Sequence, residues 1–178
     1  MTLHIAQVTI QGITTNVATI RKIRESQASL RPVDLDRVIR EEITHHPDAH
    51  IAYNGSHSPV LADNLLPEIF MNLIGNATKH GGPGVAITVT VEDAAEDEVV
   101  AVTIADNGPG VPDDAKEKIF TRFGQGMASG HGQGLGLSIC RMLLDRYGGT
   151  IRVDDRVEGH PEEGAAFRFT LRKAGGRR

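Results

Sequence analysis

One row of polar side chains on an otherwise apolar helix constrains this chain more than any other feature of its sequence. From Pro67 onward, apolar residues recur at a spacing of three and four, until the Gly-Gly-Pro-Gly run at residues 81–84 ends the helix. Pro67 suits a first helical turn, and Asp63 is the candidate N-cap. The apolar face holds Ile69, Phe70, Leu73, Ile74 and Ala77, and the polar row holds Asn72, Asn76, Lys79 and His80. The helix therefore covers a core and presents amide and basic groups beside it.

Extended segments after this helix indicate what it covers. Residues 85–91 alternate clearly between apolar and other residues, residues 99–105 form a second strand, and the acidic stretch 92–98 fits an exposed turn. The later elements are expected at residues 135–147 (helix), 150–154 (strand) and 165–171 (strand). This order predicts an α+β fold, a two-layer α/β sandwich whose mixed, mostly antiparallel sheet has helices on one face.

Residues 1–30 form a separate unit in this interpretation, and residues 31–178 form the main domain, because Pro32 disfavours helix in the residue before it. Alternating spacings of three and four predict a coiled-coil-like N-terminal helix with the stripe Leu3, Ala6, Ile10, Ile13, Val17 and Ile20. Such a stripe fits either a helix lying on its own domain or a homodimer through residues 3–27.

The middle of the chain has several local signals. Asp34 is expected to cap a helix that runs to Thr44. Asn54-Gly55 predicts a hairpin between residues 50–53 and 58–61, and a short helix is expected at residues 113–120. The histidines at positions 45, 46 and 50 lack a carboxylate or thiol cluster with ligand spacing, which favours surface residues over a metal site.

Composition narrows the function classes. The net charge of -4, the absence of tryptophan and the aromatic content of 4% argue against nucleic-acid binding. No apolar run approaches the roughly 20 residues of a membrane span, and no signal-peptide pattern is present. Cys140 is the single cysteine, which excludes an internal disulfide. We expect a cytoplasmic protein with no membrane segment in this chain, although a parent protein can be membrane-anchored.

Two glycine-rich turns accompany the polar helix. Asp106 follows a strand and can accept a hydrogen bond from an amino group such as that of adenine, while Gly108 and Gly110 leave room for a flat ring. The Gly-Gln-Gly-Leu-Gly run at residues 132–136 brings backbone N–H groups and a helix N-terminus toward phosphates. An asparagine oxygen suits Mg²⁺ when phosphates supply the charge. Singly these signals are weak, since the second turn is neither a dinucleotide fingerprint nor a Walker loop.

Together and in this order, the pieces resemble the catalytic and ATP-binding domain of sensor histidine kinases. This domain belongs to a wider superfamily that also includes gyrase, the ninety-kilodalton heat-shock chaperone and the mismatch-repair protein MutL. Four stretches look like the sequence boxes of the histidine kinase domain. Residues 72–80 resemble the N box, residues 106–110 the first glycine box, residues 119–123 the F box and residues 132–137 the second glycine box. The resemblance covers residues 32–172 and implies the Bergerat ATP-binding fold with ATP and Mg²⁺ as cofactors.

The resemblance also implies roles for individual residues. Asn76 would be the Mg²⁺ ligand, Asn72 and Lys79 would be catalytic residues near the phosphates, and Asp106 would bind the adenine amino group. Residues 121–133 would form an ATP lid. The other nucleotide contacts would be His80, Gly108, Gly110, Ile119, Phe120, Arg122, Gly132, Gln133, Gly134, Leu135 and Gly136.

Asn72 separates the reaction types within this resemblance. Hydrolytic members and anti-sigma serine kinases carry a glutamate four residues before the magnesium asparagine, where it acts as a base. Asn72 lacks that carboxylate, which favours transfer of the γ-phosphoryl of Mg-ATP to a neutral imidazole over hydrolysis. The alternatives are a non-catalytic ATP-dependent interaction module and an anti-sigma-like serine kinase.

The acceptor histidine is expected outside this chain. His4 lies closer to Asn72 than the family's acceptor does and is followed by Ile5-Ala6 instead of an acidic residue. Residues 1–30 look like the end of the second dimerisation helix, so the chain is expected to be inactive alone. The expected partners are a histidine-containing dimerisation domain, in the same parent protein or in trans, and a response regulator downstream.

Overall fold

A five-stranded sheet with the strand order β2-β4-β5-β7-β6 forms the floor of the fold. The computed structural model describes residues 18–25, 29–55, 58–94, 98–121 and 135–175. The strands are β2 (His50–Asn54), β4 (Ala86–Asp93), β5 (Val99–Asp106), β6 (Ile151–Val157) and β7 (His160–Arg172). β2 and β4 are parallel, and the other neighbouring pairs are antiparallel. The predicted mixed, mostly antiparallel sheet is therefore confirmed.

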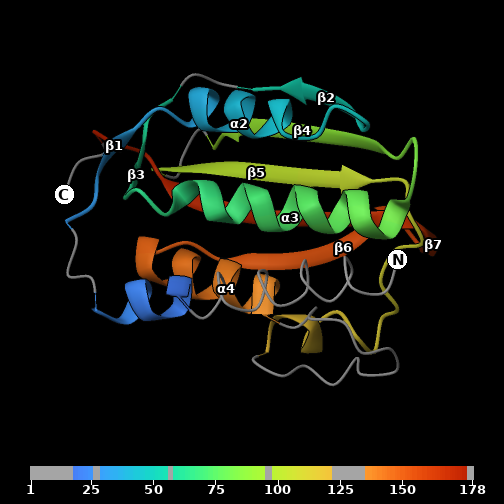
Figure 1. The fold of residues 1–178 in the computed structure, drawn as a ribbon. Helices are drawn as coiled ribbons and strands as arrows, with labels where there is room; N and C mark the ends of the chain where they lie inside the picture. The colour runs from blue at the N-terminus through green and yellow to red at the C-terminus, as the bar shows by residue number, and fades with distance from the viewer. Residues whose placement is uncertain (1–17, 26–28, 56–57, 95–97, 122–134, 176–178) are drawn as a thin grey trace, which may run out of the picture.

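Three helices form the second layer. α2 (Leu35–Thr44), α3 (Leu66–Gly81) and α4 (Leu135–Tyr147) lie side by side on one face of the sheet, with α3 in the middle (Figure 1). The predicted apolar face of α3 is buried throughout, and Phe70 meets Phe169 of β7 edge to face at 5.7 Å between ring centroids. Burying each such side chain stabilises the fold by about 1.5–3 kcal/mol. The two-layer α/β sandwich is confirmed.

A second, two-stranded sheet replaces the predicted hairpin. β3 (Val60–Ala62) pairs antiparallel with β1 (Arg31–Val33), while β2 pairs with β4 in the main sheet. The prediction of a hairpin between residues 50–53 and 58–61 is therefore wrong. Val60 and Ala62 are fully buried, so β3 gains its stability from the core under α3 and not from the neighbouring strand in the sequence.

The start of α3 also differs from its prediction. Leu65 is the N-cap residue, and no side chain caps it, although Pro67 does lie in the first turn. The Asp63 carboxylate instead accepts hydrogen bonds from the Leu65 N–H at 2.9 Å and the Tyr147 hydroxyl at 2.5 Å. Asp63 thus joins the turn before α3 to the end of α4. The cap of α2 is as predicted, since Asp34 accepts from the backbone N–H of Arg37.

The predicted helix at residues 113–120 is a series of turns followed by a single 3-10 turn, η1 (Lys118–Phe120). Most of its backbone bonds join residues three apart, including Ala115 to Pro112 at 2.9 Å and Thr121 to Lys118 at 3.1 Å. A segment this short gains too few bonds to offset helix nucleation, so it remains in the tighter 3-10 pattern.

Residues 18–25 are helical and pack on the main domain. Ile20 is only 7% exposed and belongs to the core, and Arg146 of α4 donates a hydrogen bond to the carbonyl of Ile23 at 3.0 Å. The rest of the predicted stripe, residues 3–17, lies outside the described residues, so both readings of the N-terminal helix remain predictions. Among the described helices, none has the length and apolar character needed to cross a bilayer.

Candidate active site

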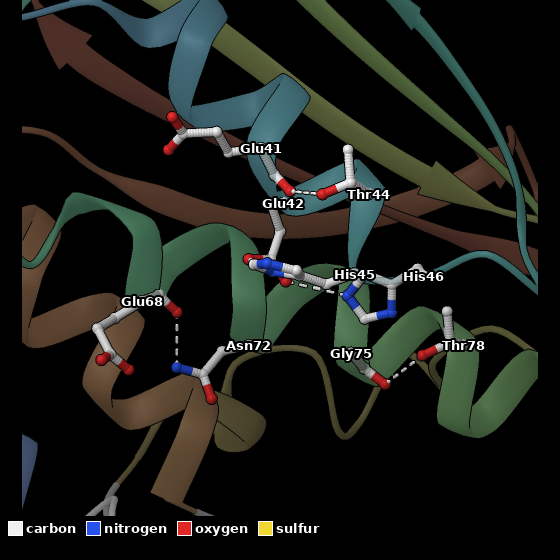
Figure 2. A network of polar contacts seen from close by, with 9 residues as sticks. All are labelled: Glu41, Glu42, Thr44, His45, His46, Glu68, Asn72, Gly75 and Thr78. Carbon is white, nitrogen blue, oxygen red and sulfur yellow. Dashed lines mark hydrogen bonds and ion pairs between the residues drawn. The ribbon is translucent and has the colours of Figure 1, made fainter.

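The polar row of α3 lies along the helix between its buried face and the solvent. Asn72 and Asn76 are half-buried, whereas Lys79 and His80 in the last turn are exposed. The side-chain N–H of Asn72 donates to the carbonyl of Glu68 one turn earlier at 2.7 Å, as Figure 2 shows. This bond fixes the amide orientation and leaves the Asn72 oxygen available on the other side.

The first turn of α4 meets that oxygen. A Cβ placed on Gly136 would lie 2.5 Å from Asn72 Oδ1, closer than side chains approach one another. Glycine at this position therefore lets the N-terminus of α4 approach α3. The first backbone N–H groups of α4, which have no partner within the helix, then lie beside the α3 amide row, where a helix N-terminus favours an anion.

The turn after β5 closes the other end of the row. Asp106 is 6% exposed, and its Oδ1 accepts a hydrogen bond from the backbone N–H of Gly108 at 2.8 Å. Asn107 exchanges hydrogen bonds with the backbone of Ala86, through its own N–H at 3.2 Å and its side-chain oxygen at 2.9 Å. A Cβ on Gly108 would lie 3.1 Å from Gly81 Cα, so the turn touches the end of α3.

The environment of Asp106 controls its protonation. Burial raises the pKa of the Asp106 carboxyl above its ordinary value of 3.8, although hydrogen bonds from the backbones of Gly108 and Ala165 and the nearby His80 and Arg156 oppose the shift. A buried carboxylate beside a glycine-rich turn is suited to accept a hydrogen bond from a ligand amino group.

Gly110 fixes the exit of the same turn. Its φ is 69°, in the left-handed region, and a Cβ there would overlap the carbonyl oxygen of Pro161. Gly164, with φ of 118°, similarly admits the carbonyl of Asp106. Both positions therefore require glycine, so the turn and the first part of β7 pack backbone against backbone.

The F-box residues after this turn pack against the core. Phe120 is 4% exposed and meets Phe167 of β7 edge to face at 6.1 Å, and Ile119 is half-buried against the core. Leu135 is half-buried at the start of α4. Four of the predicted nucleotide contacts, Arg122, Gly132, Gln133 and Gly134, lie outside the described residues.

The structure thus brings two of the sequence motifs to α3, the helix that carries the third. The Asp106 turn touches the C-terminal end of α3 through Gly108, and the start of α4 touches its middle through Gly136. Sequence reasoning missed the role of Glu68, whose carbonyl holds the Asn72 side chain. The spacing of four between these two residues is a signal for such a helix-internal contact.

The histidines after α2 belong to a different cluster. Glu42, only 6% exposed, lies between His45 and His46, with nitrogen-to-oxygen distances of 3.3 and 3.0 Å (Figure 2). His46 is mostly covered, with 18% of its side chain exposed, so its prediction as a plain surface residue is wrong in detail. These contacts close the C-terminal end of α2 locally.

Comparison with known proteins adds to this geometry. Residues 62–175 match the family described as histidine kinase-, DNA gyrase B- and HSP90-like ATPase. The signal transduction histidine-protein kinase AfsQ2 of Streptomyces coelicolor is 40% identical over 123 residues, which cover 67% of this chain and 21% of that kinase. The chain therefore spans about a fifth of the length of this curated relative.

Solved structures of histidine kinases share the fold. ShkA full-length in complex with AMPPNP aligns with a TM-score of 0.72 and 30% identity, over 90% of this chain and 35% of that one. Histidine kinase ThkA in complex with the response regulator protein TrrA aligns with a TM-score of 0.72 and 27% identity, over 95% of this chain and 49% of that one. The likeness extends over the helix layer and the sheet that carry the site.

Proposed function

This chain belongs to the histidine kinase-, DNA gyrase B- and HSP90-like ATPase family, and from that premise we propose that it is the ATP-binding catalytic module of a sensor histidine kinase. It would transfer the γ-phosphoryl group of Mg-ATP to a histidine on a dimerisation domain. The observation that carries this proposal is the convergence of the α3 amide row, the Asp106 turn and the N-terminus of α4.

Each part of the site has a distinct task in this proposal. The Asp106 carboxylate accepts a hydrogen bond from the adenine amino group, and the adjacent glycines admit the ring. His80 lies beside the nucleoside, and Lys79 contributes a positive charge near the phosphates. The start of α4 adds backbone N–H groups for a phosphate oxygen. Gly132, Gln133, Gly134 and Arg122 complete the nucleotide contacts in this proposal.

Magnesium fits the available donors. Mg²⁺ keeps several waters and shares phosphate oxygens, so it needs only one or two protein ligands, and the half-buried Asn76 carboxamide can be one of them. The one three-ligand group found among the described residues, His160, Glu162 and Glu163, is exposed at the start of β7. It lies beside the Gly110 end of the Asp106 turn and does not include Asn76. The ion would neutralise charge on the phosphates during transfer.

The lack of a carboxylate at position 72 favours a histidine acceptor. Asn72 carries no carboxylate, and Glu68 lies two helical turns, about 12 Å along the axis, before Asn76. A neutral imidazole nitrogen can attack without losing a proton first. The new N–P bond forms as the bond from the γ-phosphorus to the β,γ-bridging oxygen breaks, and ADP leaves with that electron pair. The site would hold ATP for this attack and activate water poorly.

The proposed partners follow from the same reaction. The acceptor histidine lies on a dimerisation domain of the parent protein or in trans, and a response regulator receives the phosphoryl group next. The complex of ThkA with TrrA supports the second partner by analogy. We also propose a cytoplasmic site of action, because the phosphoryl donor is ATP, and a homodimer through residues 3–27 when the preceding helix is present.

Phosphotransfer in trans tests the function. The chain is mixed with Mg-ATP radiolabelled on the γ-phosphate and with the dimerisation domain of its parent kinase. We expect acid-labile, alkali-stable label on that domain, and none with Asn76→Ala or without the domain. ATP binding without any transfer to the cognate histidine would contradict the kinase function and favour a nucleotide-dependent interaction module.

A further inference from the structure

A single lysine ties the segment after the Asp106 turn to the sheet. Lys116 Nζ lies 2.5 Å from Asp113 Oδ1 within the segment and 2.5 Å from Asp155 Oδ1 on β6. The side chains of Lys116 and Asp155 are 19% and 15% exposed, whereas that of Asp113 is 80% exposed. The bond to Asp155 is therefore the covered one, and it joins residues 39 positions apart.

The position of Asp155 in the sheet connects the Lys116–Asp155 ion pair to the Asp106 turn. Asp155 pairs with Ala165 of β7, next to the irregularity in the β6–β7 register. Gly164, the residue before Ala165 in β7, packs against the backbone carbonyl of Asp106. Lys116 thus binds the β6–β7 pair next to the point where β7 packs against Asp106. The backbone of Lys116 also continues the segment that begins with the Asp106 turn.

An ordinary surface ion pair would not carry such a role, because exposed pairs contribute only about 0–1 kcal/mol. Here one ammonium serves two carboxylates and is itself mostly covered. Removing it would leave two like charges together without a counterion. Among the described residues, the segment would then be held to the sheet by apolar contacts alone, namely Phe120 against Phe167 and Val111 and Ile119 against the core.

We propose that Lys116 is a positioning residue for base recognition: by bridging Asp113 and Asp155 it fixes the Asp106–Gly110 turn against β6 and β7. This inference rests on the proposed nucleotide-binding function. It assigns Lys116 an effect on the adenine end of the ligand and none on the phosphate end.

The test compares nucleotide affinities of Lys116→Met with those of wild type by calorimetric titration in the presence of Mg²⁺. We expect the dissociation constant for ATP to rise about fivefold, which is the scale of a single pairwise coupling. The preference for ATP over GTP should fall by a similar factor, while the dissociation constant for inorganic tripolyphosphate should stay unchanged. Asp155→Asn should reproduce these effects.

Two further variants separate positioning from general stability. Lys116→Arg keeps the charge and reach and should restore ATP affinity. Lys118→Met removes an exposed lysine two residues away, for which the described residues show no ion pair, and should change neither affinity nor preference. A lower melting temperature with an unchanged ATP-to-GTP preference in Lys116→Met would overturn the inference. If wild type fails to bind ATP at all, the proposed function itself is wrong.

Discussion

The side-chain oxygen of Asn72 occupies the space that a Cβ on Gly136 would need, with 2.5 Å between the two positions. The same Asn72 side chain is held by the Glu68 carbonyl from the opposite direction. α3 and α4 therefore meet through one amide and one missing side chain. This contact sets how far the N-terminus of α4 advances toward the proposed phosphates.

Gly136→Ala should destabilise the folded protein and weaken ATP binding. The added methyl group forces Asn72 to leave the Glu68 carbonyl or pushes α4 outward, and overpacking of this kind costs about 1–3 kcal/mol. We expect a lower free energy of unfolding in urea and a higher dissociation constant for ATP, measured on the same preparation.

The double variant Asn72→Ala/Gly136→Ala is the control for this clash. With the amide gone, alanine in the helix should become neutral or stabilising by about 0.5–1 kcal/mol relative to glycine. Stability should then recover to that of Asn72→Ala alone or above it. An equal loss from Gly136→Ala in both backgrounds would show that the two residues do not interact.

Asp106 should make ATP binding sensitive to acid. Because burial raises the pKa of its carboxyl, Asp106 takes up a proton at a pH above its ordinary pKa of 3.8. The protonated carboxyl loses the charge that strengthens the bond to the adenine amino group, so affinity falls as the pH is lowered. Titrations with ATP across mildly acidic pH, corrected with tripolyphosphate for phosphate protonation, should locate the midpoint above 3.8.

His80 provides an internal check on this assignment. The charge of His80 lowers the pKa of Asp106, so His80→Gln should move the midpoint of the affinity loss to higher pH. Circular dichroism at each pH monitors folding. A midpoint that stays unchanged in His80→Gln, or that lies at or below 3.8, would show that another group governs the effect.

Periodicity predicted the elements that bury a regular face. The apolar face of α3, the alternation of β4 and the span of α4 were all predicted within one or two residues, because each has a periodic pattern. The two helices also have a clear glycine stop. Asp34 as a cap was also predictable, since its partner Arg37 lies three residues away.

Contacts between residues far apart in the sequence could not be predicted, because local sequence patterns carry no information about them. Asn54-Gly55 predicts a hairpin turn but does not say that β2 pairs with β4 and β3 with β1. Asp63 looked like a cap because only its neighbours were visible, whereas its main partner is Tyr147. The same limit applies to the candidate site. The motifs could be recognised in the sequence, but the contacts of Gly136 with Asn72 and of Lys116 with Asp155 could be seen only in the folded structure.

Tyr147→Phe should lower stability without changing ATP affinity. The Tyr147 hydroxyl donates to Asp63 Oδ1 at 2.5 Å, and both residues are buried. Deleting the hydroxyl leaves the carboxylate with Leu65 and with Arg146, which lies 3.1 Å away, and should cost about 1–3 kcal/mol. Urea unfolding measures the loss. A large rise in the dissociation constant for ATP would place this contact in the site, contrary to its position at the opposite end of α4.

Cys140 offers a probe of the α3–α4 contact. Its thiol is fully buried and lies 3.7 Å from the carbonyl of Ile69 on α3, and burial raises its pKa, so little thiolate forms and little of it is accessible. An aromatic disulfide reagent at mildly alkaline pH should therefore modify the folded protein slowly and the urea-unfolded protein at once. The slow rate reports how often α4 separates from α3. Gly136→Ala should accelerate it, Asn72→Ala/Gly136→Ala should not, and reaction of the folded wild type as fast as a free thiol would contradict the packing of these helices.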